Sequence, residues 1–151
     1  MSNQSKKKPI LQLLISSKGK KNFNFLDEMF HKCDADQFSI LLVDQTNRET
    51  NFKPFHKNYS FDYYNIPSNG LSNSRNFAIN KSDAEICLIC DDDVVFEKNF
   101  ANIIIKSFQT EKSADIITFR ANNKFNKPFK KYPDKTTHNY KTIAYINSFL
   151  I

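Results

Sequence analysis

Three short apolar runs constrain the fold more than any other feature of this sequence. They span residues 10–16, 38–43 and 85–90, and each gives way to polar residues within one or two positions. Continuous apolar character over so few residues is typical of strands buried on both faces, as in parallel sheets. We therefore predict that the three runs are buried strands.

Segments with helical periodicity separate these strands. The apolar spacing predicts helices over residues 22–33, 71–80 and 97–109, the second with a Ser or Asn cap. Further strands are predicted over residues 61–66 and 114–119 and within 140–151. Alternating strands and helices imply βαβ crossovers, so the predicted fold class is α/β, with a mainly parallel central sheet and flanking helices.

The length and charge of the chain limit its domain organisation and its partners. Its 151 residues suit one domain over residues 9–151, preceded by a disordered basic arm over residues 1–8. The net charge of +6 attracts anions, but no recognition signature accompanies the lysines, so no nucleic-acid partner is expected. With neither a membrane span nor an export signal in the sequence, we expect a cytoplasmic protein, at most peripheral to the inner face of the membrane.

The three cysteines, Cys33, Cys87 and Cys90, point to a reducing compartment because their number is odd and no disulfide framework is visible. Cys87 and Cys90 have the C-x-x-C spacing of some zinc and redox sites. No second pair and no histidine cluster completes a zinc site. Because the pair lies inside an apolar run, we predict that both cysteines pack in the core.

Acidic residues follow two of the predicted strands. Asp44 follows the second run, and Asp91-Asp92-Asp93 follows the run at 85–90. In open α/β sheets ligands bind beyond the carboxyl ends of the strands. Two carboxylates about 4 Å apart repel by about 4 kcal/mol at an effective dielectric of 20, so three in succession need a cation, protonation or full solvation. Mg²⁺ or Mn²⁺ fits such oxygen ligands; the alternative is an acidic turn that caps the next helix.

A second motif is Gly70-Leu71-Ser72-Asn73-Ser74-Arg75-Asn76. Its glycine turn opens a predicted helix, whose first amides favour anions. Arg75 lies in the early turns of this helix, within reach of a phosphate or a base. The alternative interpretation is a capped helix that carries a surface arginine.

Four segments taken together resemble family 2 glycosyltransferases, which have the GT-A (Rossmann-like) nucleotide-diphospho-sugar transferase fold. The segments are residues 13–19, 41–46, 70–76 and 89–93, and their order matches over residues 10 to 120. The resemblance implies sugar transfer with inversion, from a nucleotide-diphosphate sugar (a UDP-sugar first) to the hydroxyl of a saccharide or lipid-linked acceptor. It also implies Mn²⁺ or Mg²⁺ as the cofactor.

The same resemblance implies roles for individual residues. Ser17 borders the nucleotide base, Asp44 contacts base or ribose, and Arg75 lies near the nucleotide. Within the triplet, Asp91 faces the ribose, Asp93 binds the metal, and Asp92 lies between them at the donor. Gln45 stands where the family often has a second acid.

No catalytic base is assigned from the sequence. Members of the family run on well past this length, and their later part supplies acceptor contacts and a catalytic carboxylate. The apolar residues 148–151 resemble the middle of such a protein, so we expect a chain truncated after the donor-binding half. A homo-oligomer that covers this apolar end is a further expectation.

Two other functions compete with this interpretation. One is a non-catalytic nucleotide-binding or interaction protein. The other is a phosphotransferase of the haloacid dehalogenase type, in which Asp91 is the nucleophile and Asp93 the acid and base of a D-x-D-x-V motif. That chemistry also needs a late acidic pair, which the sequence after Asp115 does not offer.

Overall fold

The structure, a computed structural model, describes residues 10–49, 51–67, 69–119, 121–122, 127–128 and 143–146. The predicted arm over residues 1–8, most of the basic stretch after residue 120 and the apolar chain end lie outside this part. The described chain divides into two compact units. The first contains residues 10–28 and 35–93, and the second contains residues 29–34 and the part from residue 94 onward.

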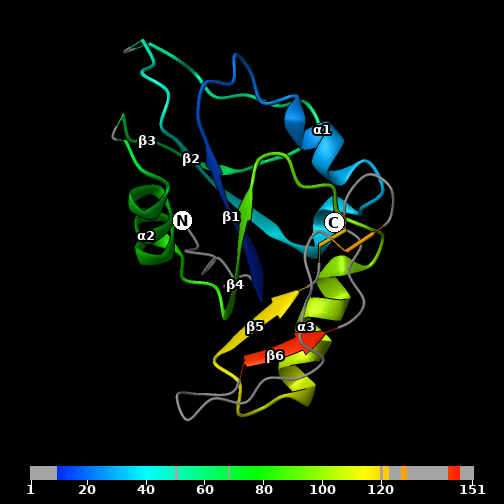
Figure 1. The fold of residues 1–151 in the computed structure, drawn as a ribbon. Coiled ribbons are helices and arrows are strands. Elements are labelled where there is room, and N and C mark those ends of the chain that lie inside the picture. Colours follow the sequence, from blue (N-terminus) through cyan, green and yellow to red (C-terminus); the bar gives the residue numbers. More distant parts are fainter. Residues whose placement is uncertain are drawn as a thin grey trace, which may run out of the picture. The chain divides into compact units, whose positions relative to one another are not determined.

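The first unit is built on a four-stranded parallel sheet with the strand order β3-β2-β1-β4 (Figure 1). The elements of this unit are β1 (Leu11–Ser17), β2 (Ser39–Asp44), β3 (Asp62–Asn65), α2 (Leu71–Lys81), β4 (Ile86–Asp91) and the 3-10 helix η1 (Ala35–Gln37). Helix α1 (Phe25–Phe30) begins in the first unit and ends in the second. The α/β fold class and the parallel sheet are thus confirmed.

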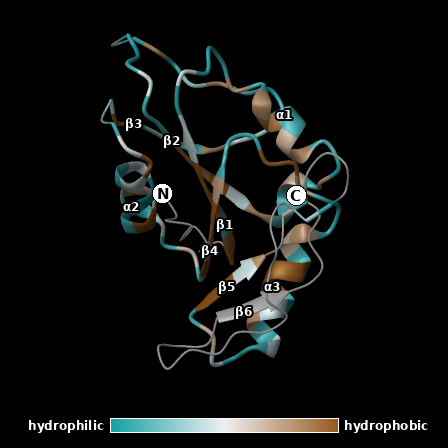
Figure 2. Cartoon of the chain, viewed as in Figure 1, coloured by the Kyte–Doolittle hydropathy of each residue, from teal (hydrophilic) through white to brown (hydrophobic). Residues whose placement is uncertain are grey.

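Burial follows strand position. Every residue of β1 is buried, because β1 lies between β2 and β4 in the sheet. Helix α2 packs on one face through Ala78, which meets Leu14, Leu41 and Val43 in the core. Figure 2 shows the apolar colouring concentrated on the strands of this sheet. The first two apolar runs, β1 and β2, therefore lie inside the sheet and are buried, as predicted.

Strand β4 departs from its prediction. We expected it to be buried on both faces, yet Ile89 is 43% exposed and Cys87 is exposed. The reason is that β4 is the edge strand of the described sheet and pairs there with β1 alone. The core prediction for the cysteine pair is consequently right for Cys90, which is buried, and wrong for Cys87.

The start of α2 also differs from expectation. Gly70 occupies the N-cap position with φ +111° and ψ +123°, and no side chain caps the helix. Backbone N–H groups of Asn73 and Ser74 donate to the Gly70 carbonyl instead. The positive φ explains why glycine stands here, because side-chain-bearing residues rarely adopt it.

The second unit contains α3 (Phe100–Thr110) and the parallel pair β5 (Ile116–Phe119) and β6 (Ile143–Ile146). Its aromatic core includes Phe30, Phe96 and Phe100, with the rings of Phe96 and Phe100 4.4 Å apart between centroids. No helix in the described ranges is long and apolar enough to cross a membrane.

Candidate functional site

The sheet register brings the predicted strand ends together. Ser17 at the end of β1 lies opposite Asp44 of β2, and Ser16 lies opposite Asp91 of β4. The backbone N–H of Gln45 donates to the Ser17 carbonyl at 2.8 Å, which fixes the β2 loop beside the β1 loop. Polar groups from three neighbouring strands therefore share one edge of the sheet, as the sequence predicts.

An open cavity of about 320 Å³ lies at this edge. It is lined by Ser16, Ser17, Lys18, Gln45, Leu71, Asp91, Asp92 and Asp93. The lining contains four of the six predicted site residues, all except Asp44 and Arg75. A second cavity of about 410 Å³ shares Lys18 and Gln45 with the first, so the two are adjacent. Its other lining residues are Gly19, Thr46, Asn47, Pro67 and Asn69.

Cations compensate two carboxylates of the acidic turn. Arg75 donates from Nη2 to Asp91 Oδ1 at 2.8 Å, so this predicted site residue reaches the cavity through Asp91. Asp92 accepts a hydrogen bond from Ser17 Oγ at 2.7 Å and lies 3.5 Å from Lys20 Nζ. Both ion pairs are partly exposed, so each contributes little to stability on its own.

The third carboxylate, that of Asp93, is exposed at the cavity. The alternative interpretation of the triplet as a helix cap is wrong, because α3 begins at Phe100 with Asn99 at its N-cap position. The acidic turn therefore has no capping role that explains its charge.

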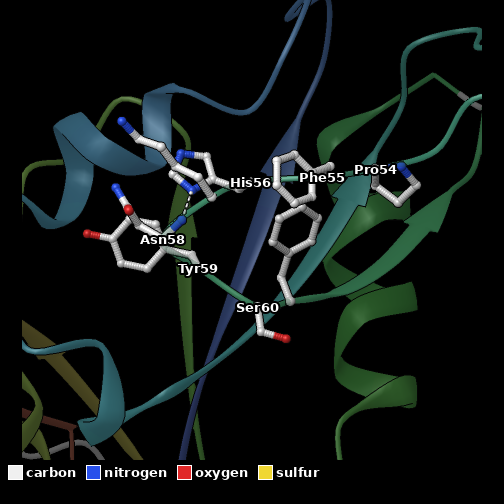
Figure 3. A pocket seen from close by; sticks show the side chains of 8 residues that line it. Pro54, Phe55, His56, Asn58, Tyr59 and Ser60 are labelled. Atoms are coloured by element: carbon white, nitrogen blue, oxygen red, sulfur yellow. Dashed lines mark hydrogen bonds between the residues drawn. The ribbon is translucent and has the colours of Figure 1, made fainter.

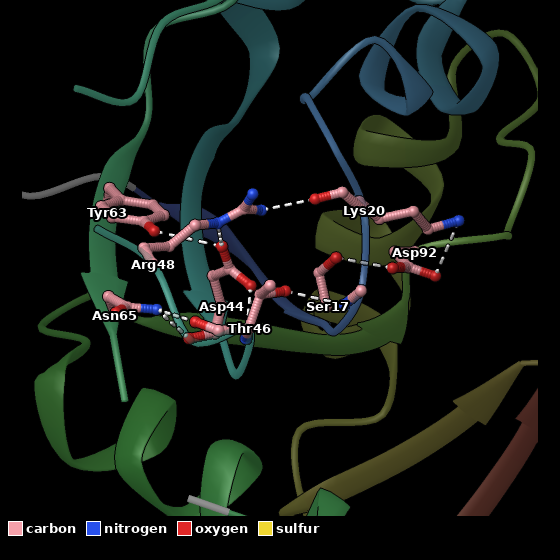
Figure 4. A network of polar contacts seen from close by, with 9 residues as sticks. Ser17, Lys20, Asp44, Thr46, Arg48, Tyr63, Asn65 and Asp92 are labelled. Carbon is pink, nitrogen blue, oxygen red and sulfur yellow. Dashed lines mark hydrogen bonds and ion pairs between the residues drawn. The ribbon is translucent and has the colours of Figure 1, made fainter. Parts of the chain in front are cut away.

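Asp44 is buried completely, and its side chain is fully engaged (Figure 4). Oδ1 accepts the backbone N–H of Thr46 at 2.8 Å. Oδ2 accepts Nε of Arg48 at 2.6 Å and the hydroxyl of Tyr63 at 3.1 Å. Burial, together with the charge and hydrogen bond of Asp44, raises the pKa of Tyr63 to about 12. The role of Asp44 at base or ribose stays a prediction, and both of its carboxylate oxygens already have protein donors.

Arg48 and Lys20 also contact this edge of the sheet, although the sequence did not point to them. Both lie in polar loops just after strands, where no periodic pattern singles out one residue. Arg48 stacks over the ring of Phe52 at 4.5 Å and donates from Nη2 to the carbonyl of Lys20 at 2.6 Å. Only the spacing of Arg48 gives a hint in the sequence. An arginine four residues after a buried aspartate is well placed to neutralise that aspartate.

The acidic turn offers carboxylates to a metal that also binds a ligand. In the described part of the chain, no group of three or more His, Cys, Asp or Glu side chains is arranged to hold a metal ion. Mg²⁺ is commonly bound by one or two carboxylates plus substrate phosphates, and the exposed Asp93 beside an open cavity suits that mode. The donor set is compatible with a metal that arrives with a phosphorylated ligand.

A cavity of about 460 Å³ lies elsewhere in the first unit, formed by residues 54–61 (Figure 3). It contains His56, whose Nδ1 accepts the backbone N–H of Asn58 at 3.1 Å. The side chain of Asn58 donates to Asp27 of α1 at 2.8 Å, which ties this loop to the helix. None of the predicted site residues lines this cavity.

A parallel sheet whose polar strand ends surround an acidic turn and two adjacent cavities is the arrangement of an α/β protein with a ligand site at the carboxyl ends of its strands. The family model described as "Glycosyl transferase family 2" matches residues 20–150, most of the chain. The chain belongs to this family.

A solved structure supports the fold. The crystal structure of TarS from S. aureus matches with a TM-score of 0.54 and 15% sequence identity, over 83% of this chain. The GT-A fold is therefore confirmed. The match covers 23% of the TarS chain, so this chain corresponds to a minor part of that protein's length. A search of curated proteins found no match.

Proposed function

We propose that the carboxyl edge of the sheet binds a nucleotide-diphosphate sugar, and that the chain takes part in sugar transfer to an acceptor hydroxyl with inversion. The observation that carries this proposal is the position of the acidic turn: Asp91, Asp92 and Asp93 line one open cavity together with Ser17. Family membership implies a nucleotide-sugar donor and a separate acceptor. A UDP-sugar is the proposed donor, and a saccharide or a lipid-linked hydroxyl is the proposed acceptor.

The charges at this edge support a metal-assisted site. The acidic turn carries three carboxylates, and three cationic side chains lie in or beside the cavity: Lys18, Lys20 and Arg75. These charges cancel, so the edge alone offers little net attraction to a diphosphate. A bound Mn²⁺ or Mg²⁺ would add the missing positive charge and stabilise the departing diphosphate. Asp93 is the proposed metal-binding residue because its carboxylate is exposed at the cavity.

The other site residues have supporting roles in this proposal. Ser17 and Asp92 are joined by a hydrogen bond and line the same cavity. Arg75 orients Asp91 toward the nucleotide. Asp44 organises the neighbouring loop that borders the cavity of about 410 Å³, where Thr46 and Asn47 offer polar groups suited to a base.

The test is calorimetry with UDP, in the presence and absence of Mn²⁺. We expect binding that requires the metal and that is lost in Asp93→Ala. Asp83→Ala is the matched control, because Asp83 is exposed and precedes the amino end of β4, at the opposite edge of the sheet. Metal-independent affinity, or equal binding by both variants, would contradict the assignment.

A second measurement separates an enzyme from a binding protein. Slow hydrolysis of UDP-sugars, measured as the release of UDP, would show that the chain activates the donor. The anomeric configuration of the released sugar would then test inversion. Tight UDP binding without release of UDP from any member of a UDP-sugar panel would favour the non-catalytic nucleotide-binding alternative. The family match disfavours the haloacid dehalogenase alternative, and a phosphatase assay on an aryl phosphate tests it directly.

A further inference from the structure

The loop after β1 carries a lysine to the edge of the acidic turn. Lys20 Nζ lies 3.5 Å from Asp92 Oδ1 and 5.5 Å from the centre of the Phe25 ring. The Lys20 side chain is 39% exposed, so its charge remains accessible to solvent and to a ligand. Gly19, with φ +77°, provides the turn that directs this loop back toward the sheet.

A buried ion pair fixes the backbone of this lysine (Figure 4). Arg48 donates to the Lys20 carbonyl at 2.6 Å through Nη2 while its Nε donates to Asp44. The Arg48 side chain is only 12% exposed, and the planar group is held over Phe52. A guanidinium with two directional donors engaged is a rigid link, because its donors have a fixed geometry.

The loop has a second attachment to the β2 loop. The Gly19 N–H donates to Thr46 Oγ1 at 2.7 Å, and Asp44 holds Thr46 through the backbone N–H. Both of these side-chain attachments therefore depend on Asp44, whose carboxylate is fully buried. Asp44 thus holds the Lys20 loop in place through its two carboxylate oxygens.

We propose that Lys20 binds the diphosphate of the donor and that the Asp44–Arg48 pair is the positioning device that holds it beside the acidic turn. This inference rests on the proposed function. The ion pair between Lys20 and Asp92 is long and partly exposed, so it is a weak competitor. A diphosphate bound at the neighbouring acidic turn is a more highly charged partner for the Lys20 ammonium group than Asp92 is. The ammonium group would then leave Asp92 and bind a phosphate oxygen.

The test compares UDP with uridine by calorimetry, both in the presence of Mn²⁺, with uridine measured through its displacement of UDP. Lys20→Met is expected to weaken UDP binding about tenfold and to leave uridine binding unchanged, because only UDP carries the phosphates. Lys20→Arg is expected to restore most of the UDP affinity, since the charge is kept. The matched control is Lys21→Met, which removes the same charge from the adjacent, exposed residue.

The positioning role of the Asp44–Arg48 pair is tested by substituting Arg48 and measuring UDP binding. Arg48→Lys keeps the charge but cannot make both directional hydrogen bonds, so we expect it to weaken UDP binding about as much as Lys20→Met. Combining the two substitutions should add little, because both act through the same ammonium group. Additive losses would overturn the proposed link.

The outcomes separate this inference from the function on which it rests. If the wild-type chain does not bind UDP in the presence of Mn²⁺, the proposed function fails. If it binds UDP but Lys20→Met behaves like Lys21→Met, or weakens uridine as strongly as UDP, the function stands and the role of Lys20 is refuted.

Discussion

The Asp44→Asn substitution tests most directly how this edge of the sheet is held together. Asp44 is 0% exposed, and its Oδ2 accepts both Arg48 Nε and the Tyr63 hydroxyl. An asparagine that keeps its oxygen toward Thr46 presents an amide N–H₂ to these two donors. The substitution therefore removes an acceptor and leaves the Arg48 guanidinium without its counter-charge in a largely buried place.

The magnitude follows from that geometry. Removing one partner of a buried ion pair costs about 3–5 kcal/mol. Arg48 keeps its hydrogen bond to Lys20 and is 12% exposed, so the lower end of that range applies. With a urea m-value of about 1.5 kcal/mol/M, a loss of about 3 kcal/mol lowers the unfolding midpoint by about 2 M.

The assay is urea unfolding followed by far-UV circular dichroism, which suits a chain with no tryptophan. Asp62→Asn is the matched control, because Asp62 is an exposed carboxylate on the neighbouring strand β3 and its loss should stay within about 0.5 kcal/mol. Asp44→Asn combined with Arg48→Met should recover part of the loss, since no unpaired charge remains. Equal midpoints for Asp44→Asn and Asp62→Asn would refute the reasoning.

Three further predictions concern other groups. Tyr63 should ionise only near pH 12 in a spectrophotometric titration, and Tyr63→Phe should remove that late step. The contribution of the neutral Tyr63 hydroxyl to stability is present below pH about 10 and is lost as the pH rises through 12. Cys87 should be the one thiol of three that a disulfide reagent modifies rapidly, so Cys87→Ser should abolish the fast phase; a fast phase that persists contradicts the exposure pattern. Gly70→Ala should destabilise the chain by about 1–2 kcal/mol because φ is +111°, whereas Gly19→Asn, at φ +77° in open space, should cost less, as measured by thermal unfolding.

The sequence predicts the sheet and the meeting of its polar strand ends well, because both follow from local patterns. Continuous apolar runs specify β1 and β2, and the residue after each run marks its carboxyl end. The position of Asp91 beside Ser16 then follows from the general rule that parallel strands end at a common edge. Burial of β4 was predicted wrongly because an apolar run does not distinguish a central strand from an edge strand.

The contacts between loops could not be predicted in the same way. Arg48 reaches Lys20 across 28 positions, and Ser17 reaches Asp92 across 75. Such pairs depend on the conformation of irregular segments, for which the sequence offers turn residues but no period. The prediction of a side-chain cap for α2 was wrong for a related reason. The backbone at Gly70 takes a positive φ that glycine allows, and the Gly70 carbonyl replaces the expected side-chain acceptor.

Exposure divides the carboxylates of this edge into two kinds, although the sequence presents them alike. Asp44 is fully buried and has three donors, so a ligand that used it would have to break those contacts first. Asp91 is 51% exposed with one cationic partner, and Asp93 is exposed at the open cavity. A carboxylate serves a ligand only when desolvating it is cheaper than the contact it gains. By that criterion the acidic turn is the part of this edge whose carboxylates are most readily given to a ligand, and Asp44 is the part that holds the surrounding loops in place.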